Sequence, residues 1–183
     1  MKPLSVRRLT FAALIAAVYA VVTILTASFA YGPVQFRIAE ALCILPFFMP
    51  FTTWGLFVGC ILANIISPVG ILDVIFGSLA TLGCCLCAAA IGRRWDGKSW
   101  GGCILACLMP VVWNAVIIGL LLALFYAEEG KAKIVLFFLY GAEVGVGELA
   151  VMFILGLPLM RWLPGSHFFA ILSERLDSEE AAE

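Results

Sequence analysis

Apolar residues fill long stretches of the chain, and charged residues are largely confined to short interruptions between them. This pattern predicts helices that cross a lipid bilayer, because about 20 residues of apolar α-helix span a hydrocarbon core roughly 30 Å thick. Glycine, proline and charged residues mark the predicted turns between the helices. Six spans are predicted, at residues 9–30, 34–50, 53–67, 73–92, 102–127 and 134–163.

The composition supports this class of protein. Hydrophobic residues make up 64% of the chain, charged residues only 13%, and the mean hydropathy is +1.12. A soluble domain is typically about half apolar and one quarter charged. We therefore expect an all-α integral membrane protein with six transmembrane helices in one bundle at residues 9–163. A basic N-terminus at residues 1–8 precedes it, and a C-terminal tail at residues 164–183 follows it, with a frayed or disordered, solvated end.

The distribution of lysine and arginine predicts the orientation of these spans. With the N-terminus inside, the inner side holds Lys2, Arg7, Arg8, Arg93, Arg94, Lys98, Arg161 and Arg175. The outer side holds Arg37, Lys131 and Lys133. Because positive residues concentrate on the cytoplasmic side of membrane proteins, both termini are predicted to be cytoplasmic, in a multi-pass protein of the bacterial cell membrane.

Two charged residues interrupt the second predicted span. Arg37 and Glu40 are three residues apart, so on a helix they share one face. A charge at the centre of a bilayer costs about 2.5–3.5 kcal/mol on insertion scales. Two interpretations follow: the two residues pair with each other and anchor a helix, or they line a polar pocket inside the protein.

Polar and aromatic residues in the other spans add candidates for ligand contacts. Asp73 stands in the first turn of its helix, where it either caps the helix or faces the pocket. Asn114 lies in mid-span and needs a partner from another helix or from a ligand. Glu143 is the strongest candidate, since a carboxylate can accept two parallel N–H bonds from a guanine-like edge or pair with an ammonium group. The complete predicted site comprises Arg37, Glu40, Asn64, Asp73, Trp113, Asn114, Tyr140 and Glu143.

Small residues recur at helical spacing in the first predicted span. Ala12, Ala16 and Ala20 form a smooth stripe that lets another helix approach closely. The stripe either packs within this chain or docks a partner subunit. A second close-approach motif, Gly141-xxx-Gly145, lies in the sixth span.

Several chemistries are excluded or disfavoured. The chain has one histidine, so it has no histidine cluster. One GxxxxGK[ST] match occurs at residues 92–99, but it lies in the polar loop between two predicted membrane spans and not between a strand and a helix, so we do not expect the chain to drive transport by its own nucleotide hydrolysis. The seven cysteines lie in apolar stretches without zinc-type spacing, so we expect packing roles and neither a metal nor a cofactor. A membrane enzyme using paired carboxylates is disfavoured, because Glu143 and Glu148 point about 140° apart on one helix. A proton-coupled secondary carrier in which these two glutamates relay protons stays an alternative, although no two matching halves are present.

Two long blocks resemble a known family. YGPVQFRIAEALCILPFF at residues 31–48, NIISPVGILDVIFGSLATL at residues 64–82, and the six-span layout are similar to the QueT family. These proteins are substrate-binding (S) components of energy-coupling factor (ECF) transporters, associated with the uptake of queuosine precursors. The resemblance covers residues 9–163.

The resemblance implies a function and partners. It implies a subunit that captures a 7-deazaguanine, such as the pre-queuosine base or queuine, from outside the cell. It further implies assembly with a transmembrane coupling subunit and two cytoplasmic ATPases, and toppling in the membrane to deliver the ligand. Related S components dock the coupling subunit through an Ala-xxx-Ala stripe on the first helix, which Ala12, Ala16 and Ala20 match.

Overall fold

The computed structural model describes residues 5–32, 34–126 and 132–180, and these residues form helices and no strands. Within these described residues, four helical stretches are long and apolar enough to cross a membrane: α1 (Val6–Leu25), α5 (Ile71–Gly92), α6 (Trp100–Phe125) and the composite stretch Lys133–Gly165. Two apolar stretches are shorter, Ile38–Phe48 and Thr52–Asn64. The all-helical prediction is confirmed, and four of the six predicted spans have helices of sufficient length.

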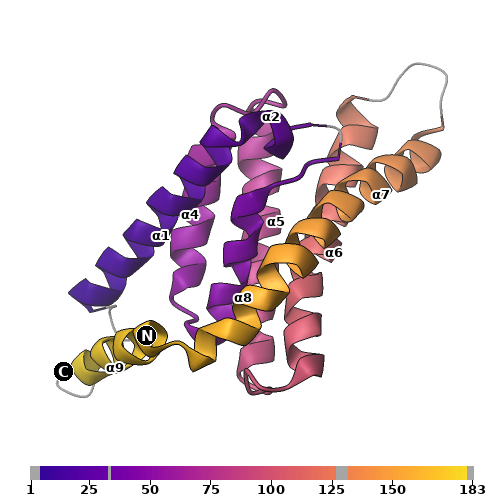
Figure 1. Ribbon diagram of the computed structural model, residues 1–183. Coiled ribbons are helices and arrows are strands. Elements are labelled where there is room, and N and C mark those ends of the chain that lie inside the picture. The colour runs from indigo at the N-terminus through magenta and orange to yellow at the C-terminus, as the bar shows by residue number, and fades with distance from the viewer. Residues whose placement is uncertain (1–4, 33, 127–131, 181–183) are drawn as a thin grey trace.

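The helices pack in chain order around the bundle. α1 packs on α4 (Thr52–Asn64), α4 on α5, α5 on α6, and α6 on α7 (Lys133–Val151) (Figure 1). Glycines permit two of these contacts. A Cβ atom on Gly59 would lie 2.7 Å from the carbonyl oxygen of Ala16, and one on Gly141 would lie 2.9 Å from that of Ala115. The backbones of α1 and α4, and of α6 and α7, therefore approach closely.

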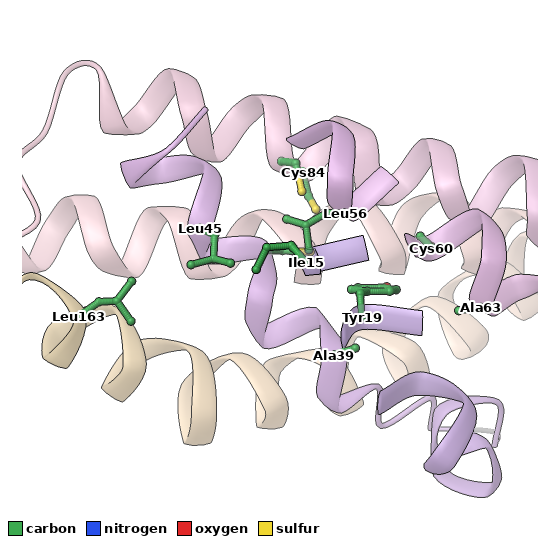
Figure 2. Close-up of a cluster of buried hydrophobic side chains, with 11 residues drawn as sticks. Ile15, Tyr19, Ala39, Leu45, Leu56, Cys60, Ala63, Cys84 and Leu163 are labelled. Atoms are coloured by element: carbon green, nitrogen blue, oxygen red, sulfur yellow. The ribbon is translucent and has the colours of Figure 1, made fainter. Parts of the chain in front are cut away.

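A short irregular segment occupies the interior of the bundle. This central segment (residues 34–48) contains the 3-10 helix η1 (Ile38–Ile44) and α3 (Leu45–Phe48). η1 contacts α1, α5, α6 and α7. Figure 2 shows two residues of the central segment, Ala39 and Leu45, within a hydrophobic cluster that also contains Ile15, Leu56 and Cys84. Because protein encloses it, its backbone does not need the regular α-helix that lipid contact would require.

The helices at the second and third predicted spans are too short to cross a bilayer, and prolines interrupt this part of the chain. α4 has 13 residues and so is about 20 Å long, less than the hydrocarbon core. Pro46 stands at the start of α3, and Pro50 lies between α3 and α4. Average hydropathy reports that a segment is apolar, but it does not distinguish burial in protein from contact with lipid.

The sixth predicted span is one continuous helical stretch with a defect. After α7, the chain forms the π-helix η2 (Met152–Gly156), then α8 (Leu157–Trp162) and the 3-10 turn η3 (Leu163–Gly165). Pro158 has no N–H to donate to the carbonyl group four residues earlier, which favours a widened turn at this position.

The prediction of a frayed C-terminal end was wrong for residues 173–180, which belong to α9 (His167–Glu180). The Ser166 hydroxyl accepts a hydrogen bond from the Phe169 N–H at 3.2 Å and so caps this helix. Phe169 packs edge-on against Phe48 with ring centres 5.5 Å apart, and Leu176 is buried. Figure 1 shows α9 crossing the end of the bundle opposite α2 (Ala27–Ala30). Residues 181–183, Lys2 and Lys131 lie outside the described residues.

Candidate functional site

Arg37 is buried at the start of the central segment, with only 2% of its surface exposed. Its guanidinium lies 3.9 Å from Glu40 Oε1 and 3.8 Å from Asp73 Oδ2, and 5.3 Å from the centre of the Tyr31 ring. The structure thus joins three residues that sequence reasoning placed in the site. The N–O distances in both ion pairs are longer than a hydrogen bond. The two carboxylates therefore offset the charge of Arg37 but leave its N–H groups able to donate to another partner.

The backbone before Arg37 is held in an unusual conformation. Gln35 has φ of +47°, in the left-handed region that residues other than glycine rarely adopt. Gly147 of α7 lies against this turn, since a Cβ atom there would come within 3.1 Å of the Gln35 carbonyl oxygen. Backbone strain of this kind persists only where its surroundings enforce it. Contact with α7 therefore helps to aim the central segment, and with it Arg37, into the bundle.

Glu40 is fully buried and well supplied with donors. The Tyr19 hydroxyl donates to its Oε1 at 2.5 Å, the Thr81 hydroxyl donates to the same oxygen at 3.3 Å, and the Cys43 thiol donates to Oε2 at 3.1 Å. These donors come from α1, α5 and η1. Glu40 therefore ties the central segment to two surrounding helices, a structural role that the sequence did not indicate.

Asn64 also has partners within the protein. Its amide nitrogen donates to the Asp73 carbonyl oxygen at 3.0 Å and approaches the Cys60 sulfur at 3.3 Å, linking the end of α4 to the first turn of α5. Gly77 makes room for this link, because a Cβ atom there would lie 2.6 Å from Asp73 Oδ1 and 2.7 Å from the Asn64 amide nitrogen. Asn64 thus positions Asp73.

Tyr31 directly follows α2 and contacts both Arg37 and the end of α4. Its hydroxyl donates to the Ala63 carbonyl oxygen at 2.6 Å, and its ring faces Arg37. Burial raises the pKa of Tyr31 to about 12, with the Arg37 charge opposing that rise and the Asp73 charge adding to it. Tyr31 therefore remains a protonated hydrogen-bond donor at physiological pH.

Several buried polar atoms on the central segment and on α5, α6 and α7 have no hydrogen-bond partner among the described residues. An unsatisfied buried donor or acceptor costs about 1–3 kcal/mol, so each of these atoms gains from a partner of complementary chemistry. They are Arg37 Nε and Nη2, Asp73 Oδ2, Ser78 Oγ, Asn114 Nδ2 and Glu148 Oε2.

Glu148 is a buried residue that the predicted site left out, although the sequence had indicated it as a possible proton relay. It is 2% exposed and lies close enough to Glu40 and Arg37 to interact with both electrostatically. Glu143, the strongest candidate from the sequence, is only half-buried. The spacing of small and apolar residues could have indicated the difference, because Val144, Gly147, Glu148 and Val151 form one buried face of α7.

The remaining predicted contacts are spread over α6 and α7. Asn114 is buried on α6 and has an unpartnered amide nitrogen. Trp113 is half-buried and packs against α5, where a Cβ atom on Gly83 would lie 2.7 Å from its ring. Tyr140 is half-buried on α7. Among the predicted site residues, those that the structure brings into direct contact are therefore Arg37, Glu40, Asn64 and Asp73.

Three buried thiols form a second cluster beside the first. The sulfur atoms of Cys43, Cys84 and Cys85 lie within 4.8 Å of one another, close enough to offer three ligands to a soft metal ion. Cys43 donates to Glu40 Oε2 and Cys84 donates to the Thr81 carbonyl oxygen, each at 3.1 Å. Thiols that donate are protonated, and protonated thiols pack as small apolar groups. The grouping of Cys43 with the other two was not evident from sequence spacing.

The alanine stripe of α1 faces the interior of the bundle. Ala12, Ala16 and Ala20 are each at most 7% exposed, and Gly55 and Gly59 of α4 pack against Ala12 and Ala16. Ala12 and Ala16 therefore pack within the chain, whereas the resemblance implied that this stripe docks a partner subunit. On the same helix, Ala13 and Ala17 are exposed.

Comparison with known proteins identifies the family. The family model described as "QueT transporter" matches residues 9–164. The Queuosine precursor transporter QueT of Lactococcus lactis subsp. cremoris (strain MG1363) is 36% identical over 72 residues, which cover 38% of this chain and 42% of that relative. No solved structure is significantly similar to the chain. The family match covers most of the chain, which therefore belongs to the QueT transporter family and is a multi-pass protein of the bacterial cell membrane rather than an enzyme.

Proposed function

We propose that this chain is the substrate-binding component of an ECF transporter and that it binds a 7-deazaguanine queuosine precursor in the centre of its bundle. The name of the Lactococcus relative supports the class of substrate, although the matched region spans less than half of that relative's length. The observation that carries the proposal is the set of buried polar atoms without partners around Arg37, Asp73, Asn114 and Glu148.

The chemistry of these atoms is complementary to that of a 7-deazaguanine. The pyrimidine edge of the base carries two adjacent N–H donors and one carbonyl acceptor. Asp73 Oδ2 and Glu148 Oε2 can accept hydrogen bonds, whereas Arg37 Nη2 and Asn114 Nδ2 can donate them. We assign Asp73 to the N–H donors of the base, because Asn64 and Gly77 hold it in place beside Arg37. Glu143 stays a candidate for a more peripheral contact.

The proposed topology has six passes and cytoplasmic termini. In this arrangement the end of the bundle that holds Tyr31 and the first turn of α5 faces the exterior. The eight-to-three distribution of lysine and arginine supports this orientation. The two short helical stretches would cross the membrane together with the long helices around them, because other helices rather than lipid cover much of their surface. A solute arriving from outside would then meet Tyr31 and Arg37 first.

The proposed partners are a transmembrane coupling subunit and two ATPase subunits. The GxxxxGK[ST] match at residues 92–99 lies between α5 and α6 and follows no strand in the described part of the chain, which is not the setting of a phosphate-binding loop, so energy from nucleotide hydrolysis would come from other chains. We place the docking surface on the exposed side of α1 that carries Ala13 and Ala17, since Ala12 and Ala16 are covered by α4. Two small exposed residues four positions apart permit close packing by a partner helix.

Reconstituted uptake tests the transport role. The protein is placed in vesicles with and without the coupling and ATPase subunits, and uptake of a labelled 7-deazaguanine is measured. We expect uptake that requires those subunits and ATP. Uptake by this chain alone, driven by a proton gradient, would instead support a secondary carrier and contradict the proposal.

A further inference from the structure

The three buried thiols beside Glu40 carry a further inference. Cys43 belongs to η1 in the central segment, and Cys84 and Cys85 are consecutive residues of α5. All three are fully buried, and their sulfur atoms lie within 4.8 Å of one another. A triangle with sides of at most 4.8 Å has a point within 4.8/√3, or about 2.8 Å, of all its corners. Bonds from a metal ion to thiolate sulfur are about 2.3 Å long, so a shift of about half an ångström by each sulfur lets all three bind one ion.

The formal charge of the occupied cluster selects the kind of ion. Three thiolates together carry three negative charges, and the Glu40 carboxylate lies beside them, with Oε2 3.1 Å from the Cys43 sulfur. Net charge in a buried site is costly, so the preferred occupant brings the three thiolates to zero. A trivalent ion does this, whereas Cu(I) and Zn(II) leave the cluster negatively charged. Zn(II) also prefers four ligands, and the cluster offers three thiols.

We propose that Cys43, Cys84 and Cys85 form a binding site for a trivalent, thiol-seeking element, of which arsenic(III) in the form of arsenous acid is the representative ligand. One molecule of As(OH)3 reacts with the three thiols to give As(SR)3 and three molecules of water. Three As–O and three S–H bonds break, three As–S and three O–H bonds form, and no electrons are transferred. Reactant and product are both neutral, so the reaction places no net charge in the bundle. The new bonds join η1 to α5.

Mass spectrometry of the purified, reduced chain incubated with sodium arsenite tests the site. We expect a mass increase of one arsenic atom less three hydrogen atoms per chain, and X-ray absorption by the arsenic should show three sulfur neighbours. Zn(II) at the same concentration should not displace the arsenic. No adduct, an adduct with only two sulfur neighbours, or displacement by Zn(II) would overturn the inference. These measurements use no 7-deazaguanine, so their failure leaves the proposed function intact.

The Cys85→Ala variant assigns the adduct to this cluster. It removes one thiol and leaves the hydrogen bonds from Cys43 to Glu40 and from Cys84 to Thr81 in place. We expect the affinity for arsenite to fall at least about tenfold, because a third thiol binds an ion already held by two others at a high effective concentration. The matched control is Cys107→Ala, which removes a buried thiol of α6 outside the cluster and should bind arsenite as the wild type does.

Thermal unfolding gives a second readout of the same site. A ligand that binds the folded chain and joins η1 to α5 raises the unfolding temperature. We expect arsenite to raise it in the wild type and in Cys107→Ala and to have little effect in Cys85→Ala. Wild-type affinity in Cys85→Ala, or an equal loss in both variants, would overturn the site. If Cys85→Ala does not fold, the hydrogen count and the sulfur coordination of the wild-type adduct still decide whether three thiols bind one arsenic.

Discussion

The Tyr19 hydroxyl donates a 2.5 Å hydrogen bond to Glu40 Oε1, joining α1 to the central segment. Both residues are fully buried, and Glu40 also lies 3.9 Å from Arg37. The same contact therefore stabilises the bundle and fixes the position of the charged group in its centre. Substituting one of these residues at a time therefore separates effects on the stability of the bundle from effects on ligand binding.

Replacing Tyr19 by phenylalanine removes the hydroxyl and leaves Glu40 with fewer donors. We expect the free energy of unfolding to fall by about 1–3 kcal/mol, the cost of unsatisfying a buried group. Thermal unfolding in detergent measures this change. Tyr126→Phe is the matched control, because that hydroxyl donates to the Val69 carbonyl oxygen from an exposed position. An equal effect of the two substitutions would contradict the structural role of Tyr19.

Replacing Gly147 by alanine should displace the central segment. A Cβ atom at this position would lie 3.1 Å from the Gln35 carbonyl oxygen and still closer to that of Val34, so the turn before Arg37 has to move. We expect lower thermal stability and weaker binding of 7-deazaguanines. Gly165→Ala is the control, since a Cβ atom there meets nothing within 4 Å. Wild-type stability and affinity in Gly147→Ala would show that this contact does not position the segment.

Replacing Asp73 by asparagine tests the residue assigned to the base. Asparagine keeps one acceptor but removes the charge that strengthens bonds to the N–H edge. We expect the affinity for 7-deazaguanine to fall about tenfold. Asp96→Asn, in the exposed loop before α6, serves as the control in the same calorimetric titrations. Unchanged affinity in Asp73→Asn would remove this carboxylate from the site.

Substitutions on the two sides of α1 distinguish packing from docking. Ala16→Leu places a large side chain against α4, where the backbones are in close contact, and should destabilise the isolated protein. Ala17→Leu lies on the exposed side and should leave thermal stability unchanged while weakening co-purification with the coupling subunit. Normal assembly of the Ala17→Leu variant would place the docking surface elsewhere.

The sequence predicted the class of fold well because hydropathy is a strong signal over long segments. It did not predict that the central segment would be enclosed by other helices, since an apolar stretch looks the same whether lipid or protein surrounds it. The short length of α4 and the 3-10 form of η1 follow from that enclosure. The C-terminal helix was missed because its average composition is polar, although Ser166 offers a cap and Phe169 and Leu176 pack against the rest of the protein.

The candidate site was predicted in part. Arg37, Glu40 and Asp73 were selected because charges in apolar segments need partners, and the structure brings these three together. The choice between Glu143 and Glu148 depended on which face of α7 is buried, a property of packing rather than of depth along the helix. Tyr19 and Thr81 were missed because each lies in an ordinary apolar helix. Their relation to Glu40 arises only from long-range contacts, 21 and 41 residues apart in sequence.

The most direct test of the account is calorimetric titration of the purified wild-type protein with 7-aminomethyl-7-deazaguanine, using adenine as the comparison compound. The buried acceptors and donors around Arg37 predict saturable binding of one molecule per chain, with adenine binding far more weakly because its edge lacks the same N–H donors. The absence of saturable binding, or equal binding of adenine, would contradict the claim that this polar cluster recognises a 7-deazaguanine.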